Sequence, residues 1–143
     1  MFMGEYRHTV DPKGRVSMPA KFRSELGETF VISKGLDKCL FVYPEKEWHN
    51  LLEKLDGQSF TQSKERRMKR FLLSGAAVCE IDKQGRVNVP QRLWDYAGVD
   101  KNAVIIGLST RLEIWNETLW DEYQESLDSD FENFDEAFGD FEL

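Results

Sequence analysis

The sequence predicts a mainly β fold with helices, of the α+β class, built from two pseudo-symmetric halves. One segment occurs twice in the chain, because HTVDPKGRVSMP at residues 8–19 matches CEIDKQGRVNVP at residues 79–90. Each copy combines strand-like runs with a tight loop that contains glycine. A lone hairpin with one or two helices makes only a thin core, so we expect the two copies to complete each other's sheets.

The duplication covers most of the chain. At a constant offset of 71, the matched pairs are Asp11 with Asp82, Gly14 with Gly85, Arg15 with Arg86, Val16 with Val87, Pro19 with Pro90 and Arg23 with Trp94. After one inserted residue the offset becomes 72, and the matched pairs are Gly35 with Gly107, Leu40 with Leu112 and Trp48 with Trp120. A unit of this length in two copies is neither a solenoid nor a propeller, and it predicts a pseudo-twofold axis.

Each copy begins with two predicted strands around the loop, followed by a short helix. The strand-like runs are YRHTV and RVSMP around DPKG in the first copy, and EI and RVNVP around DKQG in the second. We expect each pair of runs to form a hairpin. KFRSEL and QRLWDYAG have helical spacing and lead to Gly27 and Gly98, as is typical of a glycine at a helix C-terminus.

A second hairpin and a longer helix complete each copy. The strand-like runs are FVIS with CLFVY in the first copy and AVIIG with RLEIW in the second, separated by GLDK and GLST. PEKEWHNLLEKL and ETLWDEYQESL follow, and their apolar residues recur at the spacing of amphipathic helices.

Two segments lie outside the repeats. The predicted division is a first repeat at 1–56, a basic helical linker at 57–76, a second repeat at 77–127 and an acidic aromatic tail at 128–143. TQSKERRMKRFLLSG in the linker predicts one helix with an apolar side. In the tail, Phe131, Phe134, Phe138 and Phe141 would share one helical face. An uncovered run of charge would instead stay disordered, and both alternatives remain open.

Composition favours a compact protein without cofactors. The 143 residues, 41% of them hydrophobic, suit one domain or two small intertwined halves. No apolar run approaches the roughly 18 residues of a membrane span, and the N-terminal segment has charges where a signal peptide would be apolar, so we expect a cytoplasmic protein. Cys39 and Cys79 are expected to be buried thiols, and His8 and His49 lack a second metal ligand at suitable spacing. We expect no metal and no cofactor.

The net charge of −7 conceals a basic body. Residues 121–143 contain ten Asp and Glu residues and no Lys or Arg. Removing these ten from the 26 acidic residues leaves 16 against 19 basic residues in 1–120, a net charge of +3. Basic residues also cluster before residue 24 and in KERRMKR at 64–70. Local patches of this kind are what an anionic partner would encounter.

The repeated motif carries a family resemblance. DPKGR at 11–15 and DKQGR at 82–86 are each followed by V-x-x-P, and with their tandem arrangement over about residues 1–127 they resemble the MraZ family. These are bacterial transcriptional regulators with two domains of the SpoVT/AbrB kind. The resemblance implies a tandem swapped-hairpin, double-split β-barrel formed by the two halves. It also implies a ring-shaped homo-oligomer on double-stranded DNA, at short direct repeats upstream of the division and cell-wall gene cluster that begins with its own gene. Such a protein would be associated with the nucleoid.

The chemistry of the loop agrees with DNA binding. The glycine permits a positive φ, and the arginine after it can project into a groove, where an Arg fork on guanine O6 and N7 is the commonest specific base contact. The aspartate can accept backbone N–H groups or orient the arginine. The predicted DNA-binding residues are Arg7, Lys13, Arg15, Lys83 and Arg86, and the predicted loop-forming residues are Asp11, Gly14, Asp82 and Gly85. Gln84 replaces Lys13 in the second loop, which removes that phosphate contact.

The sequence is compatible with three alternative functions for its motifs. Two D-x-x-G loops are similar to the aspartic-protease arrangement, but the loops lack the small hydroxyl residue and place an Arg beside each carboxylate, so we expect no catalytic residue and no small-molecule substrate. An antitoxin would also carry an acidic tail, but it usually has one barrel motif per chain. KERRMKR could be a second DNA site, although a solvated helix face is the preferred interpretation.

Overall fold

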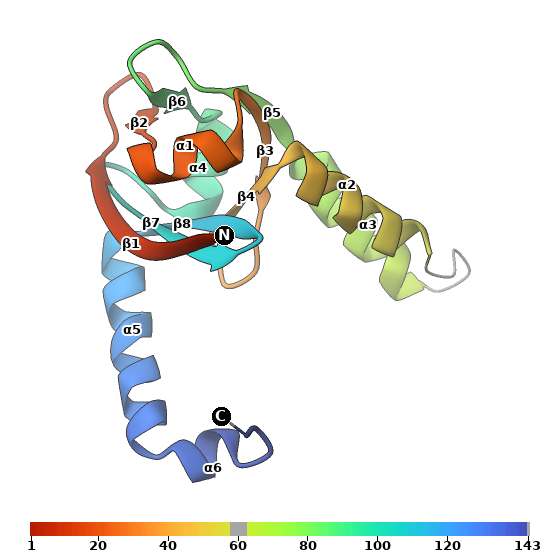
Figure 1. The fold of residues 1–143 in the computed structure, drawn as a ribbon, viewed down its shortest axis with the longest axis vertical. Coiled ribbons are helices and arrows are strands. Elements are labelled where there is room, and N and C mark those ends of the chain that lie inside the picture. Colours follow the sequence, from red (N-terminus) through yellow and green to blue (C-terminus); the bar gives the residue numbers. More distant parts are fainter. Residues whose placement is uncertain (58–62, 143) are drawn as a thin grey trace.

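The strands of the two copies interleave in two antiparallel sheets, as Figure 1 shows for the computed structural model, which describes residues 1–57 and 63–142. The first copy supplies β1 (Phe2–Thr9), β2 (Arg15–Ser17), β3 (Thr29–Lys34) and β4 (Leu40–Pro44). The second copy supplies β5 (Ala77–Glu80), β6 (Arg86–Asn88), β7 (Asn102–Ser109) and β8 (Arg111–Asn116). Six strands form one sheet in the order β1-β7-β8-β4-β3-β5, and β2 pairs with β6 as a separate two-stranded ribbon.

The copies complete each other's sheets, as the duplication predicted. β1 pairs with β7, β5 with β3, β4 with β8 and β2 with β6, so each of these ladders joins one copy to the other. Val16 lies opposite Val87 in the ribbon, and Phe41 lies opposite Glu113 in the β4–β8 ladder. These pairs are equivalent positions of the two repeats, and they therefore mark where the pseudo-twofold axis crosses each sheet.

The prediction of a hairpin around each D-x-x-G-R loop is wrong. In the described strands, β1 and β2 form no ladder with each other, and β5 approaches β6 only through the isolated bridge between Ile81 and Val87. The local pattern identified the turn correctly, but both strands at each turn pair with the other copy. The other two predicted hairpins are confirmed as β3–β4 and β7–β8.

Six helices are present in the described residues. They are α1 (Ala20–Leu26), α2 (Glu45–Asp56), α3 (Ser63–Gly75), α4 (Gln91–Ala97), α5 (Glu117–Glu132) and α6 (Phe134–Phe138). α1 and α4 end at Gly27 and Gly98, which have φ of +82° and +67°. Thr61 and Gln62, with which the linker helix was predicted to begin, lie outside the described residues.

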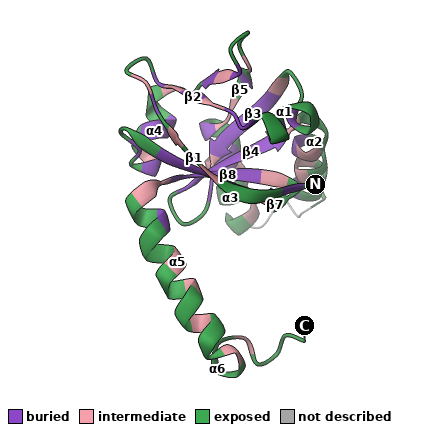
Figure 2. Cartoon of the chain, turned by 60° about the vertical axis from the view of Figure 1, so that its left-hand side comes forward, coloured by how far each residue is buried: buried purple, intermediate pink, exposed green. Residues whose placement is uncertain are grey.

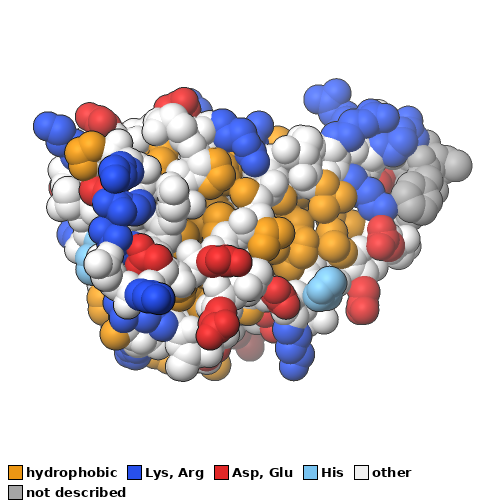
Figure 3. Space-filling view, turned by 90° about the horizontal axis from the view of Figure 1, so that it is seen from above, with side chains coloured by type: hydrophobic (Ala, Val, Ile, Leu, Met, Phe, Trp, Pro, Cys, Tyr) orange, Lys and Arg blue, Asp and Glu red, His pale blue; other side chains and the backbone are white. Residues whose placement is uncertain are grey.

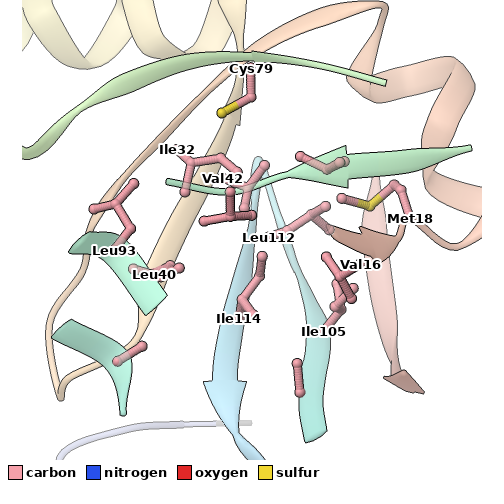
Figure 4. Close-up of a cluster of buried hydrophobic side chains, with 14 of the residues drawn as sticks. Val16, Met18, Ile32, Leu40, Val42, Cys79, Leu93, Ile105, Leu112 and Ile114 are labelled. Atoms are coloured by element: carbon pink, nitrogen blue, oxygen red, sulfur yellow. The ribbon is translucent and has the colours of Figure 1, made fainter. Parts of the chain in front are cut away.

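Two apolar clusters fill the two faces of the large sheet. On one face the ribbon, α1 and α4 enclose the larger cluster, part of which Figure 4 shows. Its centre contains residues from both repeats, such as Ile32 and Val42 from the first copy and Ile105 and Ile114 from the second. On the other face α2 and the first turns of α5 cover Phe41, Tyr43 and Trp115. The strand pairing of the described residues contains no closed barrel.

α5 projects away from the sheet as an exposed rod. Its first turns pack on β7 and β8, and Asn116 caps it by accepting a hydrogen bond from the Leu119 N–H at 2.9 Å. Figure 2 shows that the rest of the helix is mainly exposed and that α6 lies at its far end. Among the described residues, no helix is long and apolar enough to cross a bilayer.

Candidate nucleic-acid interface

The first loop holds its arginine with a carboxylate clamp. Asp11 Oδ1 accepts hydrogen bonds from the backbone N–H groups of Lys13 and Arg15, both at 2.9 Å. Asp11 Oδ2 accepts a third bond from Arg15 Nε at 2.7 Å. One carboxylate therefore closes the turn and also orients the guanidinium, so the two roles considered for the aspartate occur together.

The second loop repeats this geometry. Asp82 Oδ1 accepts from the N–H groups of Gln84 and Arg86 at 2.9 Å, and Asp82 Oδ2 accepts from Arg86 Nε at 3.0 Å. Gly14 and Gly85 have φ of +81° and +76°, a conformation that side chains other than that of glycine rarely adopt. Two identical clamps thus stand at equivalent positions of the pseudo-twofold.

Hydrogen bonding favours the ionised form of both aspartates. The backbone N–H of Arg15, with smaller effects from the Arg15 side chain and the Lys13 N–H, holds the pKa of Asp11 below its ordinary value. The backbone N–H groups of Arg86 and Gln84, and the Arg86 side chain, do the same for the pKa of Asp82. Both clamps are therefore fully charged at neutral pH.

The ribbon presents both arginines on one outward surface. Val16 and Val87 are 1% and 0% exposed and point into the core. Because side chains alternate along a strand, the flanking residues of β2 and β6 point outward. These are Arg15, Ser17, Arg86 and Asn88. Sequence reasoning missed Ser17 and Asn88, although the alternation in RVS and RVN contained the signal.

The tips of both arginines are available to a ligand. Only the Nε of Arg15 and of Arg86 donates to a carboxylate. Within the described part of the chain, the terminal nitrogens of these two side chains donate no hydrogen bond. These nitrogens form the fork that can bind two acceptors of a planar partner.

Lysines flank the ribbon. Lys13 and Lys83 are exposed residues of the two loops, one on each side of the pseudo-twofold. Figure 3 looks onto the end of the molecule that carries the ribbon and shows several Lys and Arg side chains spread over it. Positive charge around the two arginine tips suits a polyanion.

Arg7 lies in a different environment from the loop residues. It is on β1, and its guanidinium contacts carboxylates at 2.7 Å (Asp121), 3.3 Å (Glu5) and 3.6 Å (Glu117). The hydrogen bond to Asp121 is the main cause that raises the pKa of Arg7, and the same contact lowers the pKa of Asp121. Arg7 thereby fastens the start of α5 to the sheet, and a phosphate would have to compete with these carboxylates.

Each loop is supported by the other copy. The Val89 N–H donates to the Gly14 carbonyl at 3.2 Å, and the Met18 N–H donates to the Gly85 carbonyl at 2.9 Å. The next layer differs between the copies. The buried Trp94 indole donates to the Gly14 carbonyl at 2.9 Å, whereas the equivalent Arg23 is exposed and its guanidinium lies directly over Gly85.

The basic segment 64–70 is the first half of α3. Leu72 is 7% exposed, and Met68 is 49% exposed on the same helix. Figure 3 shows a group of Lys and Arg side chains near the start of α3, next to the residues drawn in grey. The segment belongs to a helix that packs on β3, away from the ribbon.

The described residues offer no group of His, Cys, Asp and Glu that could hold a metal ion. Cys39 and Cys79 are buried free thiols, as predicted. Burial raises the pKa of Cys79 to about 11 and raises that of Cys39 further, so neither is an ionised nucleophile at neutral pH.

Comparison with known proteins identifies the family. A family model described as "MraZ protein, putative antitoxin-like" matches residues 1–71 and again residues 72–141. The chain belongs to the MraZ family. It contains two MraZ repeats, which together span nearly all of its length.

Curated relatives of the MraZ family match the chain from end to end. A protein named transcriptional regulator MraZ from Natranaerobius thermophilus is 53% identical over 143 residues, covering all of both chains. Proteins of the same name from Caldanaerobacter subterraneus and Heliobacterium modesticaldum are 50% and 51% identical, again over the full length of both chains. The MraZ family is one of transcriptional regulators and not of enzymes.

Proposed function

We propose that the chain is a sequence-specific DNA-binding transcriptional regulator. The single observation that carries this proposal is the pair of identical carboxylate clamps on the β2–β6 ribbon. They orient Arg15 and Arg86 outward on one surface with their terminal nitrogens available. A two-stranded ribbon fits the major groove of B-DNA, and an arginine fork there can bind guanine O6 and N7.

The other predicted site residues have supporting roles in the proposal. Lys13 and Lys83 contact phosphates on either side of the ribbon, and Asp11, Gly14, Asp82 and Gly85 hold the loops in shape. Ser17 and Asn88 lie beside the arginines and contact base edges or sugar-phosphate groups. Arg7 reaches a phosphate only when its contacts with Asp121 and Glu117 loosen.

The targets and the assembly are proposed on the family resemblance. The protein binds short direct repeats upstream of the division and cell-wall gene cluster, including its own gene, as a ring-shaped homo-oligomer associated with the nucleoid. The two interleaved halves form a double-split barrel of the AbrB kind, with repeats at 1–56 and 77–127, a linker at 57–76 and a tail at 128–143. Two clamps in one chain favour a regulator over an antitoxin with one motif.

A gel-shift experiment tests the function directly. The full-length protein should bind a fragment from upstream of its own gene more tightly than a scrambled fragment of equal length and composition. Equal affinity for both fragments would contradict sequence-specific recognition. Copurification with a ribonuclease-like partner that occludes the ribbon would favour the antitoxin alternative.

The affinity of the protein for DNA should fall steeply as the salt concentration rises. For duplex DNA, log affinity falls with log salt at about −0.9 per phosphate neutralised. Substituting Lys13 or Lys83 with alanine should therefore make the slope shallower by about 0.9 for each subunit engaged.

A fragment with two direct repeats should bind far more tightly than one with a single repeat, because linked contacts multiply affinity. Equal affinity for one and two repeats, measured in parallel titrations, would argue against a ring that engages several sites.

The acidic tail should oppose DNA binding at low salt. Residues 128–142 contain seven Asp and Glu residues, which repel the phosphate backbone and compete for the basic loops. A chain that ends at Leu127 should bind a fragment with a single repeat, on which assembly adds no affinity, more tightly at low ionic strength, and the difference should shrink as salt screens the charges. Fluorescence anisotropy across a salt series measures both effects. Unchanged affinity for the single-repeat fragment at low salt would remove the tail from DNA binding.

A further inference from the structure

The end of the tail carries a cluster of aromatic rings. The ring centroids of Phe131, Phe134 and Phe138 are 4.8 to 5.7 Å apart, and Phe131 is 55% exposed. Phe141 follows and is 63% exposed. The helix breaks at Asn133, with φ −117° and ψ 50°, so the phenylalanines form a knob and not the single straight stripe that their spacing predicted. An exposed aromatic knob surrounded by carboxylates is a typical protein-binding element.

Among the described residues, no other element of the same chain covers the knob. Besides β7 and β8, on which its first turns pack, α5 has appreciable contact only with α6 among the described elements. Arg7 fixes its start through Asp121, and Trp120 does so through a hydrogen bond from its Nε1 to Glu5 at 2.6 Å. In both Figure 1 and Figure 2, α6 lies well away from the body of the molecule. The described part of the chain therefore offers the knob no partner.

A groove of complementary character lies between α3 and the β3–β4 hairpin. It has a volume of about 640 Å³. Its apolar lining residues are Leu36, Phe41, Tyr43, Leu51, Met68, Phe71 and Leu72. Leu36 and Met68 are 64% and 49% exposed, so apolar surface is open to solvent here.

The rim of this groove is basic. Lys64, Arg67 and Arg70 border it, and all three are exposed. Among the described residues, none of these three side chains has an acidic partner. An apolar floor with a cationic rim matches an aromatic knob that is flanked by Asp130, Asp135 and Glu136.

We propose that the phenylalanine knob of one chain docks in the α3 groove of a second copy of the same chain. Clustered apolar anchors commonly seat helical segments in grooves, and the rings of Phe131, Phe134 and Phe138 lie together at the junction of α5 and α6. Knob and groove are different surfaces, so the contact is heterologous and runs head to tail. Such a contact closes into a ring when the rotation between subunits permits it. The inference goes beyond DNA binding and rests on the proposed self-association.

Two full-length variants each remove one of the two proposed contact surfaces. The knob variant carries Phe131→Ser, Phe134→Ser and Phe138→Ser, and keeps its groove. The groove variant carries Leu36→Glu and Met68→Glu, and keeps its knob. All five changes are at partly or largely exposed positions, and circular dichroism checks the fold. Val78→Glu, at a 72% exposed position outside the groove, is the matched control.

Native mass spectrometry without DNA gives the decisive result. We expect an oligomer for the wild type and the control, and monomers for each variant alone. An equimolar mixture of the two variants should form a dimer and stop there, because it has one intact knob–groove pair. Folded variants that keep the wild-type mass, or whose mixture stays monomeric, would overturn the proposal while leaving DNA binding intact. A monomeric wild type would overturn the proposed ring as well.

Discussion

Replacing Arg15 and Arg86 together with alanine should abolish sequence-specific DNA binding and leave the fold and the oligomeric mass unchanged. Each bidentate contact to guanine discriminates by about 1–3 kcal/mol, so losing both should weaken specific binding at least about 30-fold per subunit. Assembly would amplify this loss, because several ribbons engage one DNA molecule. Gel shift on the intact and the scrambled promoter fragment measures the effect.

Two exposed lysines of α2 provide the control for charge. Lys46→Ala with Lys54→Ala also removes two positive charges, but both positions are on α2, which Figure 1 shows away from the ribbon. We expect this variant to lose only the small, non-specific part of the affinity. Specific binding by the double arginine variant that equals the wild type, with unchanged circular dichroism, would place the recognition surface elsewhere on the molecule.

The sequence was sufficient to predict the interleaved fold but not the pairing at the loops. The constant offset between Asp11 and Asp82 indicated two halves that share one sheet, and the described strands confirm it. The D-x-x-G-R pattern specifies a turn through its aspartate and glycine, which is local chemistry. Which strand lies beside β2 is decided by burial of Val16 against Val87, 71 residues away, and no local pattern encodes that choice.

The surroundings of the candidate site were also harder to predict, because they depend on contacts between residues far apart in the sequence. Lys13 and Arg7 looked alike in sequence, as basic residues near the first loop. The structure separates them, because Asp121 comes from a helix 114 residues further along the chain and pairs with Arg7. The tail spacing likewise placed the phenylalanines on one helical face, with disorder as the alternative, but it does not encode the break at Asn133 across which the rings cluster.

The two loops have the same Asp–Arg clamp, but different side chains support them from behind. Trp94 is 1% exposed and holds the first loop from within the core. Arg23, its equivalent, donates from Nε to the Met18 carbonyl at 2.9 Å and covers the second loop from outside. The sequence alignment paired the two residues, but only the structure reveals that one is a core residue and the other a surface cation beside Arg86.

Substituting Trp94 with alanine should therefore destabilise the protein far more than substituting Arg23. Removing a fully buried aromatic side chain typically costs about 3–5 kcal/mol, through lost burial and the cavity left behind. The Gly14 carbonyl would also lose the indole hydrogen bond and keep only the one from Val89. Because small proteins are stable by roughly 5–15 kcal/mol, this is a large fraction of the total. Urea unfolding followed by circular dichroism should show a clear fall in the midpoint concentration.

Arg23→Ala provides the matched comparison at the equivalent position of the other copy. It removes one side-chain hydrogen bond at an exposed site, so we expect a loss of no more than about 1 kcal/mol. Its effect should instead appear in DNA binding, because a positive charge beside Arg86 disappears. Similar losses of stability in the two variants would show that the loops have equivalent support, contrary to the burial of Trp94 and the exposure of Arg23.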